Sequence, residues 1–286
     1  MTSKNKKFNK QCKKIAILLP VYGLDNPDYL DSCIKSLINT TYPSDKKNIY
    51  IGIDGPICNE LENVIYKFKN HIHKIIRSEK NGGLFNILNE LIRSLGGEKY
   101  IFRMDADDIC LPDRFLVQVE FLESNPNLAA CGGSLLEFGD DFLHYGVREF
   151  PFNSKSCFEN LAKGVPIAHP AACFNRSVLR GDLVYPPMRF NEDIALWFDL
   201  ARKGYEFGNV RECVIEVRLN DVSINRRGRE KAVEELSVYV RGSWALYGLN
   251  YRLIFPFLRF LFRILPKALR RFFYRRTSIR SKILSL

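Results

Sequence analysis

Short apolar runs alternate with amphipathic helical patterns along the first hundred residues, and this alternation constrains the fold more than any other feature. The apolar runs are bounded by charge, proline or glycine, as buried parallel strands are. They lie at 15–19, 49–53, 74–76 and 100–104. The helical patterns between them lie at about 28–39, 59–70 and 81–94. Strand–helix alternation with short loops predicts an open, doubly wound α/β sheet.

The remainder of the chain continues this mixture of elements less regularly. We expect helices near 114–123 and 192–203, and strands near 128–133, 207–210 and 213–219. No internal repeat or low-complexity tract is present. A chain of 286 residues is long enough to bury a sizeable core.

The positive charge is concentrated at one end of the chain. The formal net charge is +11, from 43 Lys and Arg against 32 Asp and Glu. No acidic residue follows Glu235, whereas residues 236–286 contain eleven basic residues. Without those eleven, residues 1–235 hold 32 basic and 32 acidic residues and are formally neutral. This distribution argues against a nucleic-acid partner for the body and indicates a basic appendage.

The eight cysteines are scattered, and none forms a C-x-x-C pair of the kind that holds zinc. We expect buried free thiols in a cytosolic protein, with disulfides as the alternative. The apolar run 15–19 is too short for a signal peptide and ends at Pro20. No uninterrupted apolar stretch reaches the length of a membrane-spanning helix.

Three polar positions follow the ends of predicted strands. Tyr22, Asp54 and Asp105 should meet at one edge of the sheet, because open α/β sheets bind ligands beyond the carboxyl ends of their strands. The third position opens the cluster Asp105-Ala106-Asp107-Asp108. Its closely spaced carboxylates suit Mg²⁺ or Mn²⁺, with Asp105 and Asp107 as ligands and substrate phosphates in the remaining positions. The alternative is a solvated acidic turn in which Asp108 or Asp113 caps the next helix.

Several motifs in order make the chain resemble bacterial family 2 glycosyltransferases with the GT-A fold, over about residues 13–225. Pro20-Val21-Tyr22 is similar to the family's opening strand motif, which lines the nucleoside pocket. Asp54 occupies the place of the carboxylate that contacts uracil, although the family's usual pair of aspartates followed by Gly-Ser is here Asp54-Gly55-Pro56. Asn81-Gly82-Gly83 resembles the turn that faces the donor, and Asp105-Ala106-Asp107-Asp108 resembles the D-x-D region that binds metal and diphosphate.

Residues 191–197, Asn-Glu-Asp-Ile-Ala-Leu-Trp, resemble the family's E-D-x-x-L-W motif, whose aspartate is taken as the general base. The positive end of a helix dipole favours ionised carboxylates, so Asp193, beside Glu192, could accept the acceptor's proton. The alternative is that both are ordinary acids in the first turn of a helix. Trp197 is assigned to the acceptor side, although its spacing also fits the core.

Three further positions are candidates by resemblance. His169, in the loop Gly164–Pro170, is an acceptor-side candidate or a structural histidine. Asn220 stands where many relatives carry a histidine that assists the metal or diphosphate, and Arg226 lies in a basic run that could contact the diphosphate or solvent. Arg103 could pair with the acidic cluster or reach the sugar.

The basic appendage has a helical pattern. Basic residues recur at 252, 259, 263, 267 and 270 within a sector of roughly 80°, with Leu, Ile and Phe between them. Such a segment is typical of a helix lying on an anionic membrane surface, which would place residues 252–286 at the inner leaflet of the plasma membrane. The alternative is a helix packed on the body with a solvated charged face.

These patterns predict an α/β protein, specifically a GT-A, Rossmann-like open mixed sheet flanked by helices, with residues 13–113 as the nucleotide-sugar half and 114–225 as the acceptor half. A basic amphipathic tail, 236–286, would follow. The resemblance implies an inverting glycosyltransferase that moves a sugar from a UDP-sugar to a glycan or polyprenol-linked acceptor in surface polysaccharide biosynthesis. Competing hypotheses are a sugar nucleotidyltransferase, an aspartate-nucleophile phosphatase, and a non-catalytic basic protein that binds membranes or RNA.

Overall fold

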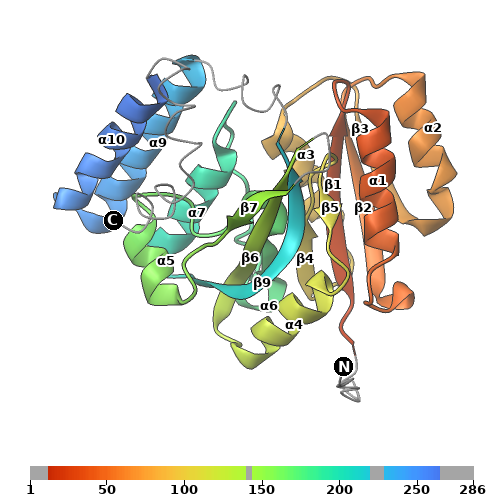
Figure 1. The fold of residues 1–286 in the computed structure, drawn as a ribbon, viewed down its shortest axis with the longest axis horizontal. Helices are drawn as coiled ribbons and strands as arrows, with labels where there is room; N and C mark the ends of the chain where they lie inside the picture. The colour runs from red at the N-terminus through yellow and green to blue at the C-terminus, as the bar shows by residue number, and fades with distance from the viewer. Residues whose placement is uncertain (1–11, 140–143, 220–228, 265–286) are drawn as a thin grey trace.

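A computed structural model describes residues 12–139, 144–219 and 229–264. Within them, the sheet has nine strands in the order β3-β2-β1-β4-β8-β6-β9-β5, with β7 paired to β6. Strands β1 to β4 are parallel neighbours, β8 is antiparallel to both β4 and β6, and β6 is parallel to β9. Helices flank this mixed sheet (Figure 1). The open mixed α/β sheet flanked by helices that the sequence predicts is therefore confirmed, and both predicted halves share one sheet.

The first half agrees closely with the expected alternation. Its strands are β1 Ile15–Tyr22, β2 Lys47–Asp54, β3 Ile72–Ser78 and β4 Tyr100–Arg103. Its helices are α1 Pro27–Ile38, α2 Asn59–Lys67 and α3 Leu84–Arg93. Short 3₁₀ turns precede β2 and β3, at Ser44–Lys46 and Lys69–His71.

The second half differs more from the expectations. Its strands are β5 Ile109–Cys110, β6 Leu128–Phe138, β7 His144–Arg148, β8 Cys173–Asn175 and β9 Glu206–Arg218. Its helices are α4 Arg114–Ser124, α5 Ser154–Asn160, α6 Arg176–Leu179 and α7 Glu192–Arg202. The two strands expected near 207–210 and 213–219 are one strand, because β9 continues through the exposed Arg211 and Glu212 and shifts its register against β6.

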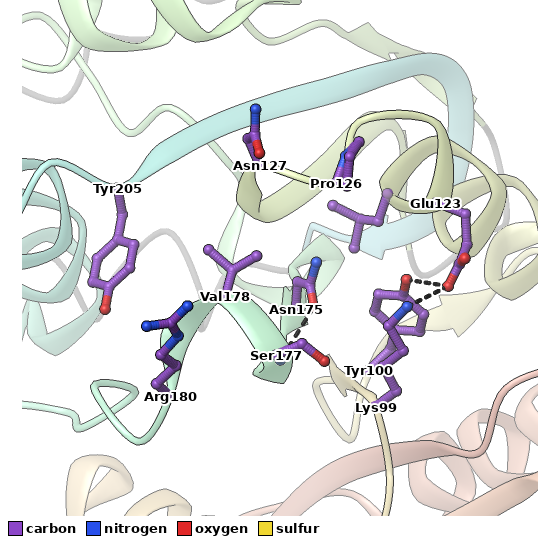
Figure 2. A pocket seen from close by; sticks show the side chains of 11 residues that line it. Lys99, Tyr100, Glu123, Pro126, Asn127, Asn175, Ser177, Val178, Arg180 and Tyr205 are labelled. Atoms are coloured by element: carbon purple, nitrogen blue, oxygen red, sulfur yellow. Dashed lines mark hydrogen bonds and ion pairs between the residues drawn. The ribbon is translucent and has the colours of Figure 1, made fainter.

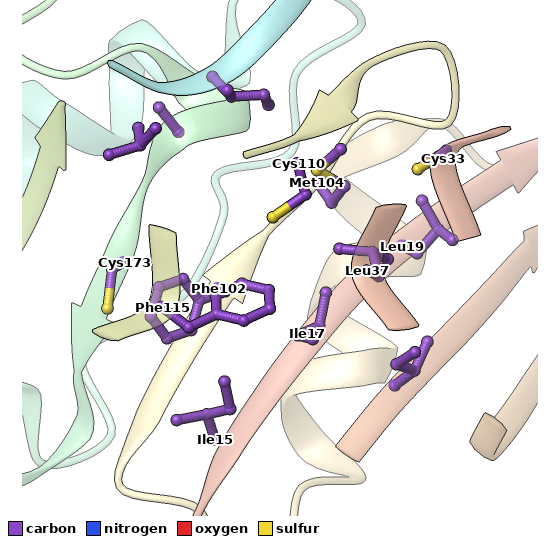
Figure 3. Packing of buried hydrophobic residues seen from close by; sticks show 14 of the residues in the cluster. Ile15, Ile17, Leu19, Cys33, Leu37, Phe102, Met104, Cys110, Phe115 and Cys173 are labelled. Atoms are coloured by element: carbon purple, nitrogen blue, oxygen red, sulfur yellow. The ribbon is translucent and has the colours of Figure 1, made fainter. Parts of the chain in front are cut away.

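Both faces of the sheet are buried, as a sheet covered by helices requires. Alternate residues of β1 enter different clusters: Ile15, Ile17 and Leu19 pack on one face, and Ala16 and Leu18 on the other. Figure 3 shows the first face, where these three β1 side chains lie near Leu37 of α1 and the rings of Phe102 and Phe115. All eight cysteines are free thiols, as expected.

Two C-terminal helices follow the sheet. Helix α9, Arg229–Tyr247, packs against α7, and α10, Ile254–Ile264, packs against α9 after a 3₁₀ turn at Tyr251–Leu253. Gly242 permits the close approach of α9 to α7, because a Cβ there would lie 2.3 Å from Phe198 Cγ. Among the described residues, no helix has both the length and the apolarity needed to cross a bilayer.

Candidate active site

The parallel strands bring the predicted polar positions to one edge of the sheet. Tyr22 and Asp54 are aligned neighbours at the ends of β1 and β2, and Asp105 follows the end of β4. Asp54 is 5% exposed, and its carboxylate oxygens accept hydrogen bonds from the backbone N–H groups of Gly82 (2.7 Å) and Gly83 (3.0 Å). Asp54 therefore positions the Asn81–Gly83 turn against the end of β2, whatever else it contacts.

The backbone at this turn requires glycine. Gly55 has φ +83°, and a Cβ there would lie 2.7 Å from the Asn81 backbone nitrogen. Gly83, with φ +88°, precedes the first residue of α3. Left-handed conformations of this kind disfavour side chains other than glycine. Gly55 thus allows the loop after β2 to pack directly against the Asn81–Gly83 turn.

The acidic cluster has the geometry of a cation site. Ligand atoms of Asp105, Asp107 and Asp108 lie within 4.8 Å of one another. Asp108 is 2% exposed, and one of its oxygens accepts a hydrogen bond from the Arg218 backbone N–H at 3.0 Å. Burial, and then the charges of Asp105 and Asp107, raise the pKa of Asp108 well above its usual value. A cation bound among these carboxylates would offset both the cost of burying the Asp108 charge and its repulsion by Asp105 and Asp107.

A divalent metal fits these residues. The second oxygen of the buried Asp108 carboxylate has no hydrogen-bond partner among the described residues. An unpaired buried carboxylate oxygen is costly unless a cation or ordered water satisfies it. The capping alternative receives no support, since Asp113 stands at the N-cap of α4 but its side chain makes no capping hydrogen bond. Asp113 instead accepts a hydrogen bond from the Thr41 hydroxyl.

Arg103 connects the acidic cluster with the rest of the site. Its side chain is 2% exposed and forms an ion pair with Asp105. Burial alone would lower the pKa of Arg103, but the carboxylates of Asp105 and Asp108 raise it overall. The same positive charge lowers the pKa values of Glu192 and Asp193 relative to burial alone. Both carboxylate groups therefore lie within the field of one buried guanidinium.

Glu192 and Asp193 occupy the first turn of α7, as the sequence predicts. Glu192 is 9% exposed, and burial together with the charge of Asp193 raises its pKa to about 7. The pKa of the partly buried Asp193 is also raised by burial, while its hydrogen bond with the Ile194 backbone and the charge of Lys231 oppose this rise. A carboxylate with a raised pKa is a stronger base, which suits the predicted role of Asp193.

His169 lies in the interior of the site. It is 7% exposed, and its Nε2 lies 2.8 Å from the Tyr185 hydroxyl. Burial and the charge of Arg103 lower the pKa of His169 well below its usual value, so the ring is neutral at physiological pH. Burial raises the pKa of Tyr185, and the charges of Glu192 and Asp193 raise it further. His169 and Tyr185 are therefore neighbours of the α7 carboxylates.

The loop that carries His169 is held by two buried side chains of α4. Arg114, 1% exposed, donates to the carbonyl oxygens of Arg103 (2.8 Å) and Pro170 (2.9 Å). Gln118, which is fully buried, donates to the Ala171 carbonyl oxygen at 2.9 Å. These bonds fix the His169 loop beside the end of β4.

Trp197 requires a correction. The side chain has no exposed surface, stacks on Phe174 with ring centroids 5.6 Å apart, and meets Phe207 edge to face. It belongs to the core between α7 and the sheet, so the prediction of an acceptor-side contact is wrong. Trp197 lies on the apolar side of α7, which an amphipathic helix packs against the sheet. Its indole ring is therefore buried there and does not reach the acceptor side.

Two predicted residues, Asn220 and Arg226, lie outside the described residues. Arg218, two residues before Asn220, is described: it is the last residue of β9 and is 3% exposed. Its Nε donates to the Asp107 carbonyl oxygen at 3.3 Å, and its guanidinium lies 3.9 Å from the ring centroid of Tyr29. The end of β9 is thus attached to the acidic cluster.

A pocket of about 620 Å³ lies at the opposite edge of the sheet. Figure 2 shows the side chains that line it. Lys99 and Tyr100, at the start of β4, line it together with Glu123, Arg180 and Tyr205. Glu123 accepts hydrogen bonds from both Lys99 Nζ and the Tyr100 hydroxyl, each at 2.6 Å. Because Asp105 follows the other end of β4, this pocket is separate from the candidate active site.

Several residues that shape the site were not identified from the sequence. Arg114 stands on an amphipathic helix, where arginine usually faces solvent, and Tyr185 lies in a segment without regular periodicity. Lys231 comes from α9, far along the chain from the acids that it affects. The sequence indicated the surroundings of these three residues only through the family resemblance of neighbouring segments.

Comparison with known proteins agrees with this geometry. The model of "Glycosyl transferase family 2" matches residues 16–183. An uncharacterized glycosyltransferase of Haemophilus influenzae is 30% identical over 269 residues, covering 90% of this chain and 96% of that protein. The UDP-Gal:alpha-D-GlcNAc-diphosphoundecaprenol beta-1,3-galactosyltransferase of Escherichia coli is 25% identical, covering 92% of this chain and 96% of that protein. The structure of S. aureus TarS 1–349 with UDP aligns with a TM-score of 0.59 at 16% identity, over 89% of this chain and 76% of that one, and shares the fold. This chain is therefore a glycosyltransferase that belongs to family 2.

Proposed function

We propose that this glycosyltransferase moves a sugar from a UDP-sugar to a hydroxyl of a lipid-linked saccharide, with inversion at the anomeric carbon, in surface polysaccharide biosynthesis. The observation that carries the proposal is the placement of two carboxylate groups around Arg103. One group, Asp105 to Asp108, can hold a cation and a diphosphate, and the other, at the start of α7, can accept a proton.

The donor would bind along the ends of β1 and β2. Pro20 and Tyr22 end β1, and Asp54 fixes the turn that contains Asn81 and Gly82. A UDP donor agrees with the substrate in the name of the Escherichia coli relative and with the UDP bound to the TarS structure. Asp105 and Asp107, with Ala106 between them, would hold Mg²⁺ or Mn²⁺, which stabilises the negative charge of the departing diphosphate.

Asp193 would act as the general base. It stands in the first turn of α7, near the buried guanidinium of Arg103 and the ring of Tyr185. Attack of the deprotonated acceptor hydroxyl on the face opposite the diphosphate gives inversion. Glu192, whose pKa is raised to about 7, is the more buried of the two and would support Asp193 rather than contact the acceptor. His169 would face the acceptor side of the same space.

The acceptor and location follow from the C-terminal region. A diphosphoundecaprenol-linked acceptor is named for the Escherichia coli relative. A lipid-linked acceptor requires access to a membrane, and residues 252–286 contain ten of the chain's basic residues and no acidic one. We therefore infer a peripheral position on the cytoplasmic face of the plasma membrane, with the glycosyltransferase domain spanning about residues 13–225.

The experiment measures two activities in the same variants. Asp105→Ala should abolish metal-dependent hydrolysis of UDP-sugars, because it removes a cation ligand. Asp193→Asn should leave Mn²⁺ and UDP binding unchanged but lower sugar transfer by about 10²–10⁴-fold, which is the usual contribution of a general base, because the amide cannot accept the proton.

Asp45→Ala is the matched control, because the Asp45 side chain is 70% exposed and lies outside the site. A panel of UDP-, GDP- and dTDP-sugars identifies the donor. Hydrolysis by Asp105→Ala at the parent rate would overturn the metal site. Transfer by Asp193→Asn at the parent rate would overturn the assignment of the base.

A further inference from the structure

The amphipathic helix α10 is oriented with its charged side inward. Arg259 Nη2 and Arg263 Nε each lie 2.7 Å from a carboxylate oxygen of Glu235 on α9, and the Glu235 side chain is 3% exposed. Arg259 Nη1 also donates to the Lys163 carbonyl oxygen at 2.9 Å. Its guanidinium stands 4.8 Å from the ring centroid of Tyr239. The arginines of α10 therefore attach the helix to the body.

The outward side of α10 is apolar. Its most exposed residues are about half accessible to solvent: Ile254 55%, Phe257 49%, Leu258 51%, Leu261 55% and Ile264 50%. At 100° per residue these five, which we call the outer apolar face, occupy a sector of about 120° centred opposite the two arginines. Helix α10 is also the outermost helix at its end of the molecule (Figure 1). A surface helix of a soluble protein normally has the reverse orientation.

The chain beyond α10 indicates what this face contacts. Residues 265–286 contain seven basic residues and no acidic residue. Two more apolar side chains, Leu249 (86% exposed) and Tyr251 (70% exposed), stand just before α10. Positive charge next to an exposed apolar helix face is complementary to an anionic lipid surface, where charged head groups lie beside the hydrocarbon boundary.

We propose that the outer apolar face of α10 inserts into the interface of an anionic bilayer, while its two arginines remain bound to Glu235. This inference rests on the proposed lipid-linked acceptor, and it names the surface through which the enzyme reaches it. It differs from attachment through a basic helix face, because the contact is hydrophobic and the internal arginines do not meet lipid.

The position of α10 relates the bilayer to the active site. Glu235 belongs to α9, and Tyr239 of the same helix meets Phe198 of α7 edge to face at 5.7 Å. Helix α7 carries Asp193 at its start. Lys163, bonded to Arg259, stands just before the Gly164–Pro170 loop that carries His169. Both acceptor-side elements are thus connected to the membrane-facing helix through direct contacts.

The test is co-sedimentation of the full chain with phosphatidylcholine vesicles that contain phosphatidylglycerol. Leu258→Ser/Leu261→Ser removes the centre of the outer apolar face without touching the ion pairs. At about 0.5 M salt, where charge attraction is strongly screened, we expect its partition coefficient to fall about 30-fold. Tyr66→Ser/Val147→Ser is the matched control, because those side chains are 67% and 56% exposed elsewhere, and it should bind as the parent does.

Two results would overturn the proposal. One is equal vesicle binding by the Leu258→Ser/Leu261→Ser variant and the parent. The other is a parent that is dimeric by light scattering and becomes monomeric in this variant with vesicle binding unchanged, which would mean that a second copy covers the face. Hydrolysis of the UDP-sugar, measured in the same samples, should be unchanged in both variants. If the parent does not hydrolyse the UDP-sugar, the proposed donor chemistry is refuted. The vesicle-binding measurement still tests the membrane contact in that case.

Discussion

The raised pKa of Glu192 should make the stability of this protein fall as the pH rises, and Glu192→Gln should remove that contribution. The pKa of Glu192 rises from 4.5 to about 7 on folding. Between these values the folded protein keeps a proton that the unfolded chain has released. Proton binding by the folded state alone stabilises it at low pH, and this stabilisation is lost as the pH rises through about 7.

The magnitude follows from the difference between the two pKa values. Integrated from pH 5 to pH 8, a carboxyl with these values costs the folded state about 2.5 kcal/mol, at 1.36 kcal/mol for each pH unit in which only one state holds the proton. Glutamine occupies nearly the same volume and carries no charge. The free energy of unfolding of Glu192→Gln, relative to the parent, should therefore increase by about 2.5 kcal/mol over this range.

Urea unfolding monitored by circular dichroism at pH 5, 6, 7 and 8, with chelator present, measures this difference. Asp193→Asn provides the control, because the charge of Asp193 is the second cause of the raised pKa of Glu192. In that background, Glu192→Gln should have a smaller effect, and the coupling energy gives the electrostatic interaction of the pair. A parallel pH profile for Glu192→Gln and the parent would refute the reasoning.

Three other substitutions test the scaffold around the site. Arg114→Met leaves two buried carbonyl oxygens without donors and should lower the free energy of unfolding by about 3 kcal/mol, measured in urea. Asp54→Ala releases the N–H groups of Gly82 and Gly83 and should weaken UDP binding about tenfold by calorimetry, with the fold intact by circular dichroism. Glu235→Gln breaks both ion pairs of α10, so tryptic cleavage within that helix should accelerate while the body remains resistant.

Local pattern predicted β1, β2 and β4 in the first half of the sheet because each of these strands contains a continuous apolar run. In β1 and β2 every described residue of the runs 15–19 and 49–53 is buried, so hydrophobicity and structure coincide. The same reasoning missed β8, which has only three residues, and α9, whose hydrophobic periodicity is weak. Long-range pairing of β8 with β4 and with β6 defines this strand, and contact with α7 defines α9. Neither partner is visible in the local sequence.

The sequence predicts the positions of the acidic residues at strand and helix ends, and the structure places Asp105 two residues after β4 and Glu192 at the start of α7. Arg103 was a candidate partner of the acidic cluster from the sequence, whereas Arg114 was not identified. Arg103 and Arg114 are buried beneath the site, where carboxylates and carbonyl oxygens satisfy their donors. Hydrophobic periodicity shows on which side of a helix or strand a basic residue lies. Whether that side chain is buried depends on the group that it binds, and this group is distant in sequence.

Helix α10 shows the same limitation with a functional consequence. Its sequence separates basic and apolar sides unambiguously, yet the pattern alone is equally compatible with either side facing the body. Glu235, the last acidic residue of the chain, decides the orientation, because a nearly buried carboxylate on α9 requires cationic partners and α10 supplies two. The apolar side is thereby exposed, and a face that would be unfavourable in water becomes favourable at a bilayer. A single acidic residue at the boundary of the basic segment thus sets which surface of the enzyme can meet lipid.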